Sequence, residues 1–137
     1  MDQNKLKVQS QITFLYYRDL EPIDKFYQEI MGLELVEDQG WAKIYRVSGQ
    51  AFLGIVDEKR GFHNAQEKNA VLVTLAVADV LWWYDYLKRK GVRMLTEIRE
   101  PEGIQVRCFF LEDPGGYAIE IEQFLKPEAA RIFHGGD

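Results

Sequence analysis

The 137-residue sequence contains one cysteine and two histidines, and what it lacks excludes several classes of protein. A single cysteine, Cys108, rules out an intrachain disulfide and a metal site built from several cysteines. No apolar run approaches the roughly 20 residues that a membrane-spanning helix needs. Residues 1–5 also lack the apolar stretch of a signal peptide. We therefore expect a cytoplasmic protein with no membrane partner.

Negative charge exceeds positive charge, and the basic residues are scattered along the chain. The chain has 17 Lys and Arg residues against 22 Asp and Glu residues, which gives a formal net charge of −5. Because nucleic-acid affinity rests on clustered cations that neutralise phosphates, we expect no nucleic-acid partner. The apolar fraction of 47% is typical of a soluble globular protein, and the length is typical of one domain.

The chain does have an internal repeat. An apolar strand at residues 11–17 leads through Asp19 into an amphipathic helix that ends at Gly32, and three strands follow. The same order of elements begins again near residue 70, with Asp79 before the second helix and Gly91 at its end. The two Asp residues are 60 positions apart and the two Gly residues 59, so the second helix has one residue fewer.

The repeat predicts an α+β fold made of two βαβββ modules. Each module is a curved mixed sheet with one helix on one face. We expect the two bare sheet faces to pair, within a chain or between chains, around a cavity lined by alternate strand residues. The expected single domain spans residues 1–137 and comprises a first module at 10–56, a linker at 57–69, a second module at 70–124 and a tail at 125–137 with a short helix.

These features resemble the vicinal oxygen chelate superfamily, which includes glyoxalase I, bleomycin resistance proteins, fosfomycin resistance enzymes and ring-cleaving dioxygenases. The resemblance covers about residues 10–124. It is carried by Tyr17-Arg18-Asp19-Leu20, by Phe26-Tyr27 with Met31-Gly32-Leu33, and by Leu111-Glu112-Asp113-Pro114-Gly115-Gly116 with Ile119-Glu120. It implies the glyoxalase/bleomycin resistance fold and, for the enzymes, a divalent metal that acts as a Lewis acid.

The resemblance also implies where metal ligands would stand. The four positions are Ile12, Gly54, Leu72 and Glu120. Only Glu120 offers a coordinating atom, so we expect no metal and no other cofactor. Gln11 lies one residue early and faces the other side of the sheet unless a bulge intervenes. The alternative is a divalent metal held by Gln11 and Glu120, with help from His63 of the linker.

Alternation along the strands predicts the side chains that line the cavity. Phe14 and Tyr16 share the cavity side of the first strand, and Glu120 and Glu122 share the inward face of the last strand. Small-molecule sites combine apolar and aromatic walls with a few placed polar groups. The predicted ligand-binding residues are Phe14, Tyr16, Trp41, Tyr45, Phe52, Cys108, Phe110, Glu120 and Glu122.

Each of these candidates also has a structural interpretation. The aromatic side chains fill the core of a barrel too small for a ligand, and Cys108 is a small apolar filler rather than a nucleophile. The inward carboxylates pair with cations of neighbouring strands, which are Arg107, Arg93 and Lys43. On the second helix, Trp82 and Tyr86 lie off the apolar stripe and indicate an exposed aromatic patch of the kind that marks protein interfaces.

Three functions are consistent with this sequence. The leading hypothesis is non-catalytic binding of a small, partly aromatic and cationic molecule, in the manner of the bleomycin resistance proteins that the sequence resembles. The second is a metal-dependent lyase or dioxygenase related to glyoxalase I. The third is a structural or regulatory dimer. The expected partners are a small-molecule ligand and a second copy of the chain in a homodimer.

Overall fold

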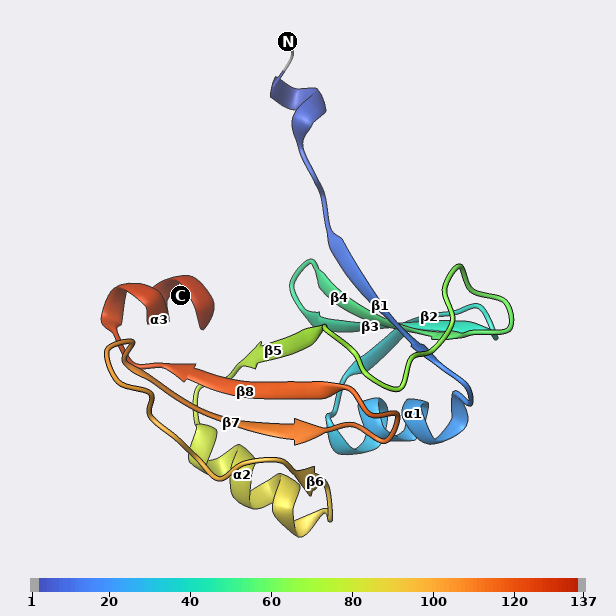
Figure 1. The fold of residues 1–137 in the computed structure, drawn as a ribbon. Coiled ribbons are helices and arrows are strands. Elements are labelled where there is room, and N and C mark those ends of the chain that lie inside the picture. Colours follow the sequence, from blue (N-terminus) through green and yellow to red (C-terminus); the bar gives the residue numbers. More distant parts are fainter. Residues whose placement is uncertain (1–2, 136–137) are drawn as a thin grey trace. The chain divides into compact units, whose positions relative to one another are not determined.

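The computed structural model describes residues 3–135, and its elements follow the order of the predicted repeat (Figure 1). The chain divides into two compact units, with the boundary between Glu67 and Lys68. This boundary lies inside the linker expected at residues 57–69. The first two residues of the expected N-terminal segment and residues 136–137 of the expected tail lie outside the described residues.

The first unit is a βαβββ module, as predicted. Its elements within the described residues are η1 (Gln3–Leu6), β1 (Gln11–Tyr17), α1 (Glu21–Lys25), η2 (Phe26–Ile30), β2 (Glu34–Asp38), β3 (Ala42–Ser48) and β4 (Ala51–Asp57). Its strands form a mixed sheet in the order β1-β4-β3-β2. β1 runs parallel to β4, and the other neighbouring strands are antiparallel.

The second unit repeats this arrangement. Its elements in the described part of the chain are β5 (Leu72–Ala76), α2 (Val80–Arg89), β6 (Arg93–Met94), β7 (Val106–Glu112), β8 (Ala118–Phe124) and α3 (Pro127–Phe133). The strand order is β5-β8-β7-β6, with β5 parallel to β8. These two mixed sheets confirm the predicted α+β class. Among residues 3–135, no helix is both long and apolar enough to cross a membrane.

The one-residue difference between the repeats is accommodated in the first helical segment. α1 continues into η2, a π-helical turn in which the Met31 N–H donates to the Phe26 carbonyl, five residues earlier, at 2.9 Å. This wider turn holds one residue more than an α-helical turn. α2 has no such turn and begins at a side-chain cap, where the Asp79 carboxylate accepts the Trp82 N–H at 3.1 Å.

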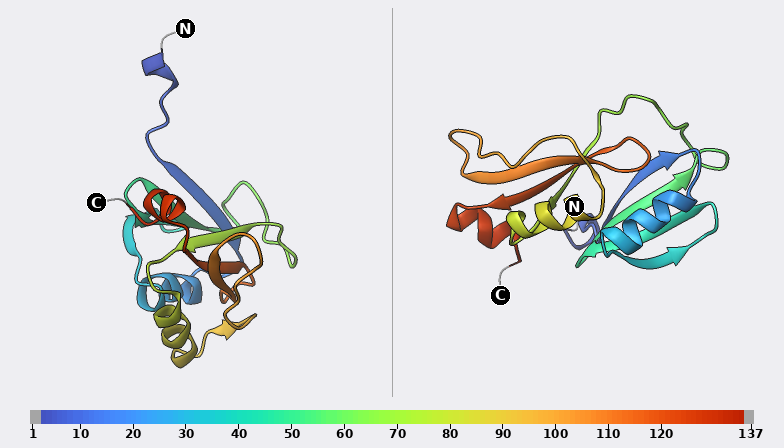
Figure 2. Two further views of the ribbon diagram at one scale, coloured as in Figure 1. Left: turned by 90° about the vertical axis from the view of Figure 1, so that its left-hand side faces the viewer. Right: turned by 90° about the horizontal axis from the view of Figure 1, so that it is seen from below.

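Each sheet buries one face against its own helix. Figure 2 shows α1 along one face of the first sheet. The buried side chains of the first unit that face the helix include Leu15, Tyr17, Tyr45, Leu53 and Ile55 from the sheet and Ile23, Phe26, Tyr27 and Met31 from the helical segment. The buried side chains of the second unit include Phe109, Leu111, Ile119 and Ile121 from the sheet and Val80 and Leu87 from α2. The helix-facing positions thus alternate along the strands as predicted.

The turn between β7 and β8 is built around Asp113, which is 2% exposed. Its carboxylate accepts the backbone N–H groups of Gly115 at 3.0 Å and Tyr117 at 2.9 Å. Such a turn, in which a side chain replaces a backbone acceptor, holds the chain reversal in one conformation. The register that results places Phe110 of β7 opposite Glu120 of β8.

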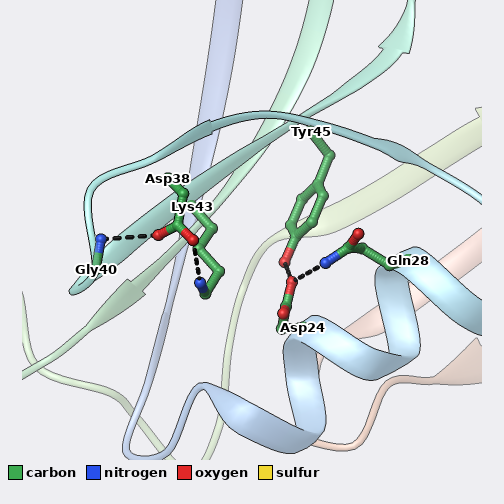
Figure 3. A network of polar contacts seen from close by, with 6 residues as sticks. All are labelled: Asp24, Gln28, Asp38, Gly40, Lys43 and Tyr45. Atoms are coloured by element: carbon green, nitrogen blue, oxygen red, sulfur yellow. Dashed lines mark hydrogen bonds and ion pairs between the residues drawn. The ribbon is translucent and has the colours of Figure 1, made fainter.

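Tyr45 faces α1, which corrects its predicted position among the cavity-lining residues (Figure 3). Its hydroxyl donates to Asp24 Oδ1 at 2.6 Å, and Gln28 Nε2 donates to the same oxygen at 2.8 Å. Burial, and then the neighbouring Asp24 carboxylate, raise the pKa of Tyr45, so the hydroxyl keeps its proton. The charged acceptor on α1 explains why this polar ring lies on the helix side of β3.

We expect Tyr45→Phe to lower the free energy of unfolding by roughly 1.5–3 kcal/mol, the range for a hydrogen bond to a charged group. The change removes the donor and leaves the ring in place. Urea denaturation of the wild type and the variant measures the difference. Tyr16→Phe, on the opposite face of the same sheet, is the control and should cost less. Equal stability of Tyr45→Phe and the wild type would contradict a structural role for the Asp24 contact.

Candidate functional site

Each unit has a sheet face that points away from its helix, and each of these open faces is a candidate functional surface. The open face of the first sheet includes Ile12, Phe14, Tyr16, Ile44, Phe52, Gly54 and Val56. The open face of the second sheet includes Leu72, Thr74, Cys108, Phe110, Glu112, Glu120 and Glu122. The structure therefore brings Phe14, Tyr16 and Phe52 together on one face, and Cys108, Phe110, Glu120 and Glu122 together on the other.

The linker folds back over one end of the first open face. The His63 ring lies edge-on to the Tyr16 ring, with 5.2 Å between centroids. Gly61 stands so close to Tyr16 and Val56 that a Cβ atom there would overlap their side chains. This contact explains why Val56 is only 3% exposed on an otherwise open face, whereas Phe14 is 40% exposed.

Two other predicted aromatic residues are in contact with arginine side chains. The Arg46 guanidinium lies 5.0 Å from the ring centroid of Phe52, on the open face. Trp41 precedes β3 and is half-buried, with the Arg60 guanidinium 5.4 Å from its ring. By the alternation of side chains along β3, Trp41 lies on the same side as Tyr45 and not on the open face. It therefore does not join the cluster of Phe14, Tyr16 and Phe52 that the structure assembles.

On the second open face, Glu120 is held by a neighbour that the sequence analysis did not single out. Thr74 Oγ1 donates to Glu120 Oε1 at 2.8 Å, across the parallel pair β5 and β8. The cations considered as partners of Glu120 bind other carboxylates: Arg107 binds Glu100 at 2.9 Å, Arg93 binds Glu112 at 3.2 Å and Lys43 binds Asp38 at 2.8 Å. The repeat could have revealed Thr74, because it aligns with Phe14, 60 residues earlier.

Burial and the two carboxylates raise the pKa values of two groups on this face. Burial, and then the negative charge of Glu120, raise the pKa of Glu122 above its usual value of 4.5. Burial, followed by a hydrogen bond to Glu120 and by the charges of both glutamates, raises the pKa of the Cys108 thiol to about 11. Cys108 is 2% exposed and stays protonated at neutral pH, so it acts as a filler rather than as a nucleophile.

The side chains at the implied metal positions do not fit a divalent ion. Ile12 and Leu72 have no coordinating atom, and their exposed side chains lie on the open faces. At Gly54 the space that a ligand side chain would need is filled by the Phe14 ring, which a Cβ atom would overlap. Among residues 3–135, no three His, Cys, Asp or Glu side chains are grouped closely enough to hold a metal.

Gln11 does not compensate for these positions. β1 pairs with β4 in an unbroken register from Gln11 to Tyr17, so no bulge turns the Gln11 side chain to the open face. Its amide instead donates to Thr13 Oγ1 at 3.2 Å, on the helix side of the strand. The arrangement thus offers carboxylates beside an aromatic ring, without the converging ligands on which metal-dependent chemistry rests.

Comparison with known proteins identifies the family. The sequence profile described as "Glyoxalase/Bleomycin resistance protein/Dioxygenase superfamily" matches residues 9–121. The chain belongs to this superfamily. The match spans both βαβββ units and confirms the resemblance drawn from the repeat and its motifs.

Relatives of different activities share this fold. A protein of Vibrio parahaemolyticus named "Probable lactoylglutathione lyase" is 30% identical over 122 residues, which cover 81% of this chain and 87% of that protein. The crystal structure of a lactoylglutathione lyase from Agrobacterium tumefaciens has a TM-score of 0.67 at 20% identity, covering 82% of this chain and 91% of that one. The fosfomycin resistance protein FosX of Listeria monocytogenes has a TM-score of 0.70 at 17% identity, covering 89% and 98%.

We expect Gly54→Ala to destabilise the protein by about 1–3 kcal/mol, the usual cost of overfilling a packed site, because the added methyl overlaps the Phe14 ring. In the Phe14→Ala background the ring that the methyl would overlap is absent. Adding Gly54→Ala there should therefore lower the stability much less than it does in the wild type. Chemical denaturation of the four proteins in this cycle measures the coupling. Additive effects of the two substitutions would mean that Phe14 does not occupy the space beside Gly54.

Proposed function

We propose that this member of the superfamily binds a small, partly aromatic molecule that carries a positive charge, and that it does so without metal-dependent catalysis. One observation carries the proposal: Glu120 and Glu122 lie on the same open face as the Phe110 ring. Carboxylates and a ring in this arrangement match an ammonium group attached to an aromatic or aliphatic frame.

The chemistry of the face supports a cationic ligand. Thr74 orients the Glu120 carboxylate by donating to one of its oxygens. Burial, and then repulsion from Glu120, disfavour the ionised form of Glu122 and raise its pKa. A bound cation favours the ionised carboxylates, because its positive charge attracts both Glu120 and Glu122. The Arg99 guanidinium, 5.9 Å from the centroid of Phe110, already uses this ring as a partner for positive charge.

Phe14, Tyr16 and Phe52 supply a different surface. They form an aromatic cluster on the open face of the first sheet, and Phe14 is 40% exposed. Such a surface suits flat apolar groups, which gain free energy from the burial of ring faces. A role of these three residues in holding an aromatic ligand stays a prediction, as does the cytoplasmic location of the protein.

We expect 2-phenylethylammonium to raise the unfolding temperature of the protein, and 2-phenylethanol, its neutral analogue, to have little effect. The stabilisation should grow as the pH rises from 4.5 through the raised pKa of Glu122, because the cation binds the ionised carboxylate. The ligand stays charged across this range, since amines titrate near pH 10. Thermal-shift measurements across this pH range provide the test.

Three variants make this experiment specific. Glu122→Gln should remove the pH dependence of the ligand effect, and Glu120→Gln should weaken the effect at every pH. Without ligand, Glu122→Gln should also be more stable than the wild type above the titration of Glu122, because an acid with a raised pKa loses stability as it ionises. Glu112→Gln, on the same face but paired with Arg93, is the matched control. Equal stabilisation by the charged and neutral compounds would refute the proposal.

The second candidate function is a metal-dependent lyase, and the relative named "Probable lactoylglutathione lyase" favours it. On this reading, purified protein should contain a divalent metal in stoichiometric amount. We expect elemental analysis to find substoichiometric nickel, zinc, iron and manganese, because Ile12, Gly54 and Leu72 supply no ligand atoms. One equivalent of metal that disappears in Glu120→Gln would favour the lyase over the binding protein.

A further inference from the structure

The segment that follows β6 lies beside β7 and places Arg99 on the open face of the second sheet. The Leu95 N–H donates to the Phe110 carbonyl at 2.8 Å. Four residues later, Arg99 and Cys108 form an antiparallel bridge, in which each N–H donates to the other's carbonyl, at 2.8 and 2.9 Å. Because directly opposite residues of an antiparallel pair point to the same face, the Arg99 side chain lies on the open face with Cys108.

Arg99 belongs to a row of side chains that crosses this sheet. Cys108 is paired with Arg99 on one side and with Glu122 on the other. Since neighbouring strands lie about 5 Å apart, the Cα atoms of Arg99 and Glu122 are separated by roughly 10 Å, with the short cysteine between them. In the next row along the strands, Phe110 lies opposite Glu120. The open face therefore presents a cation and a carboxylate at the two ends of one row, beside an aromatic ring.

The buried Cys108 thiol lies within reach of all three charges. Burial raises its pKa most, the hydrogen bond to Glu120 and the charges of Glu120 and Glu122 raise it further, and the charge of Arg99 lowers it. The Arg99 guanidinium is also 5.9 Å from the ring centroid of Phe110. The guanidinium, the two carboxylates and the ring are thus gathered around one point of the open face.

Arg99 differs from the other arginines of this sheet in having no acidic partner. Arg93 pairs with Glu112 at 3.2 Å and Arg107 pairs with Glu100 at 2.9 Å. Among residues 3–135, no carboxylate lies within ion-pair distance of the Arg99 guanidinium. A guanidinium presents a planar set of donors that matches the two oxygens of a carboxylate. Arg99 is therefore available to an anionic group of a bound molecule.

We propose that the ligand of the second open face is a zwitterion, an aromatic α-amino acid whose carboxylate binds Arg99 and whose ammonium group binds Glu120 and Glu122. This inference rests on the function proposed above and adds the anionic half of the ligand. The aromatic ring of the amino acid packs against Phe110. Arg99 would repel a simple cation, and the two glutamates would repel a dianion such as a phosphate monoester. A molecule with one charge of each sign is attracted by both ends of the row.

Three compounds with the same phenylethyl frame test the proposal by isothermal titration calorimetry. Free phenylalanine carries both charges, 2-phenylethylammonium lacks the carboxylate, and 3-phenylpropanoate lacks the ammonium group. At pH 7 the amino groups are protonated and the carboxylates are ionised. We expect phenylalanine to have a Kd roughly tenfold lower than that of 2-phenylethylammonium, the effect of a hydrogen bond between charged groups. The compound without an ammonium group should bind most weakly, because only Arg99 attracts it.

Two arginine variants locate the carboxylate of the ligand. Arg99→Gln should abolish the advantage of phenylalanine over 2-phenylethylammonium, and it should not weaken the binding of 2-phenylethylammonium, because it removes a repelling charge. Arg107→Gln removes the same charge from the helix side of β7, where Arg107 pairs with Glu100. This matched control should keep the advantage of phenylalanine. Circular dichroism shows that each variant is folded.

The failure of this inference can be told apart from the failure of the proposed function. If 2-phenylethylammonium binds and the carboxylate adds nothing, or if its contribution persists in Arg99→Gln, the zwitterion is refuted and the binding of cations stands. If 3-phenylpropanoate binds as tightly as phenylalanine, the glutamates have no role, and both proposals are overturned. Absence of binding by all three compounds overturns both proposals as well.

Discussion

Parallel pairing of the first and last strands in each unit determines which side chains meet on the open faces. β1 and β4 run in unbroken register, which sets Phe14 beside Gly54. β5 and β8 do the same in the second unit, which sets Thr74 beside Glu120. Because side chains alternate across a sheet, a slip of one residue in either pair would exchange the open face for the buried face. The helix-facing apolar residues prevent such a slip, since it would expose them to water.

The two units use this common geometry for different chemistry. In the first unit, the position of an implied metal ligand is a glycine, and its missing side chain makes room for an aromatic ring. In the second unit, the equivalent strand retains Glu120, which a threonine from the neighbouring strand holds by a hydrogen bond. The duplicated fold therefore supplies one aromatic surface and one acidic surface. Neither surface has the converging ligands that the resemblance implies for the enzymes.

Much of the fold could be read from the sequence because the helices and strands have different apolar periods. Alternation placed Leu15 and Ile121 on the buried faces, where the structure has them. The prediction was wrong for Tyr45, because an aromatic residue can pack on either side of a strand and its residue type does not say which. The deciding contact, from its hydroxyl to Asp24, joins residues 21 positions apart. A hydrogen bond of that kind between separate elements has no signature in local sequence.

The sequence alone determined the duplicated order of elements, the family resemblance and the absence of ligand atoms at positions 12, 54 and 72. These conclusions depend only on residue type and spacing, which tertiary structure cannot change. The tertiary structure alone decided that Phe14 fills the space beside Gly54, that Thr74 holds Glu120 and that Trp82 stacks on Tyr86 in an exposed position. The physical reason is that ring and hydrogen-bond contacts depend on side-chain directions and packing, which only the folded backbone sets.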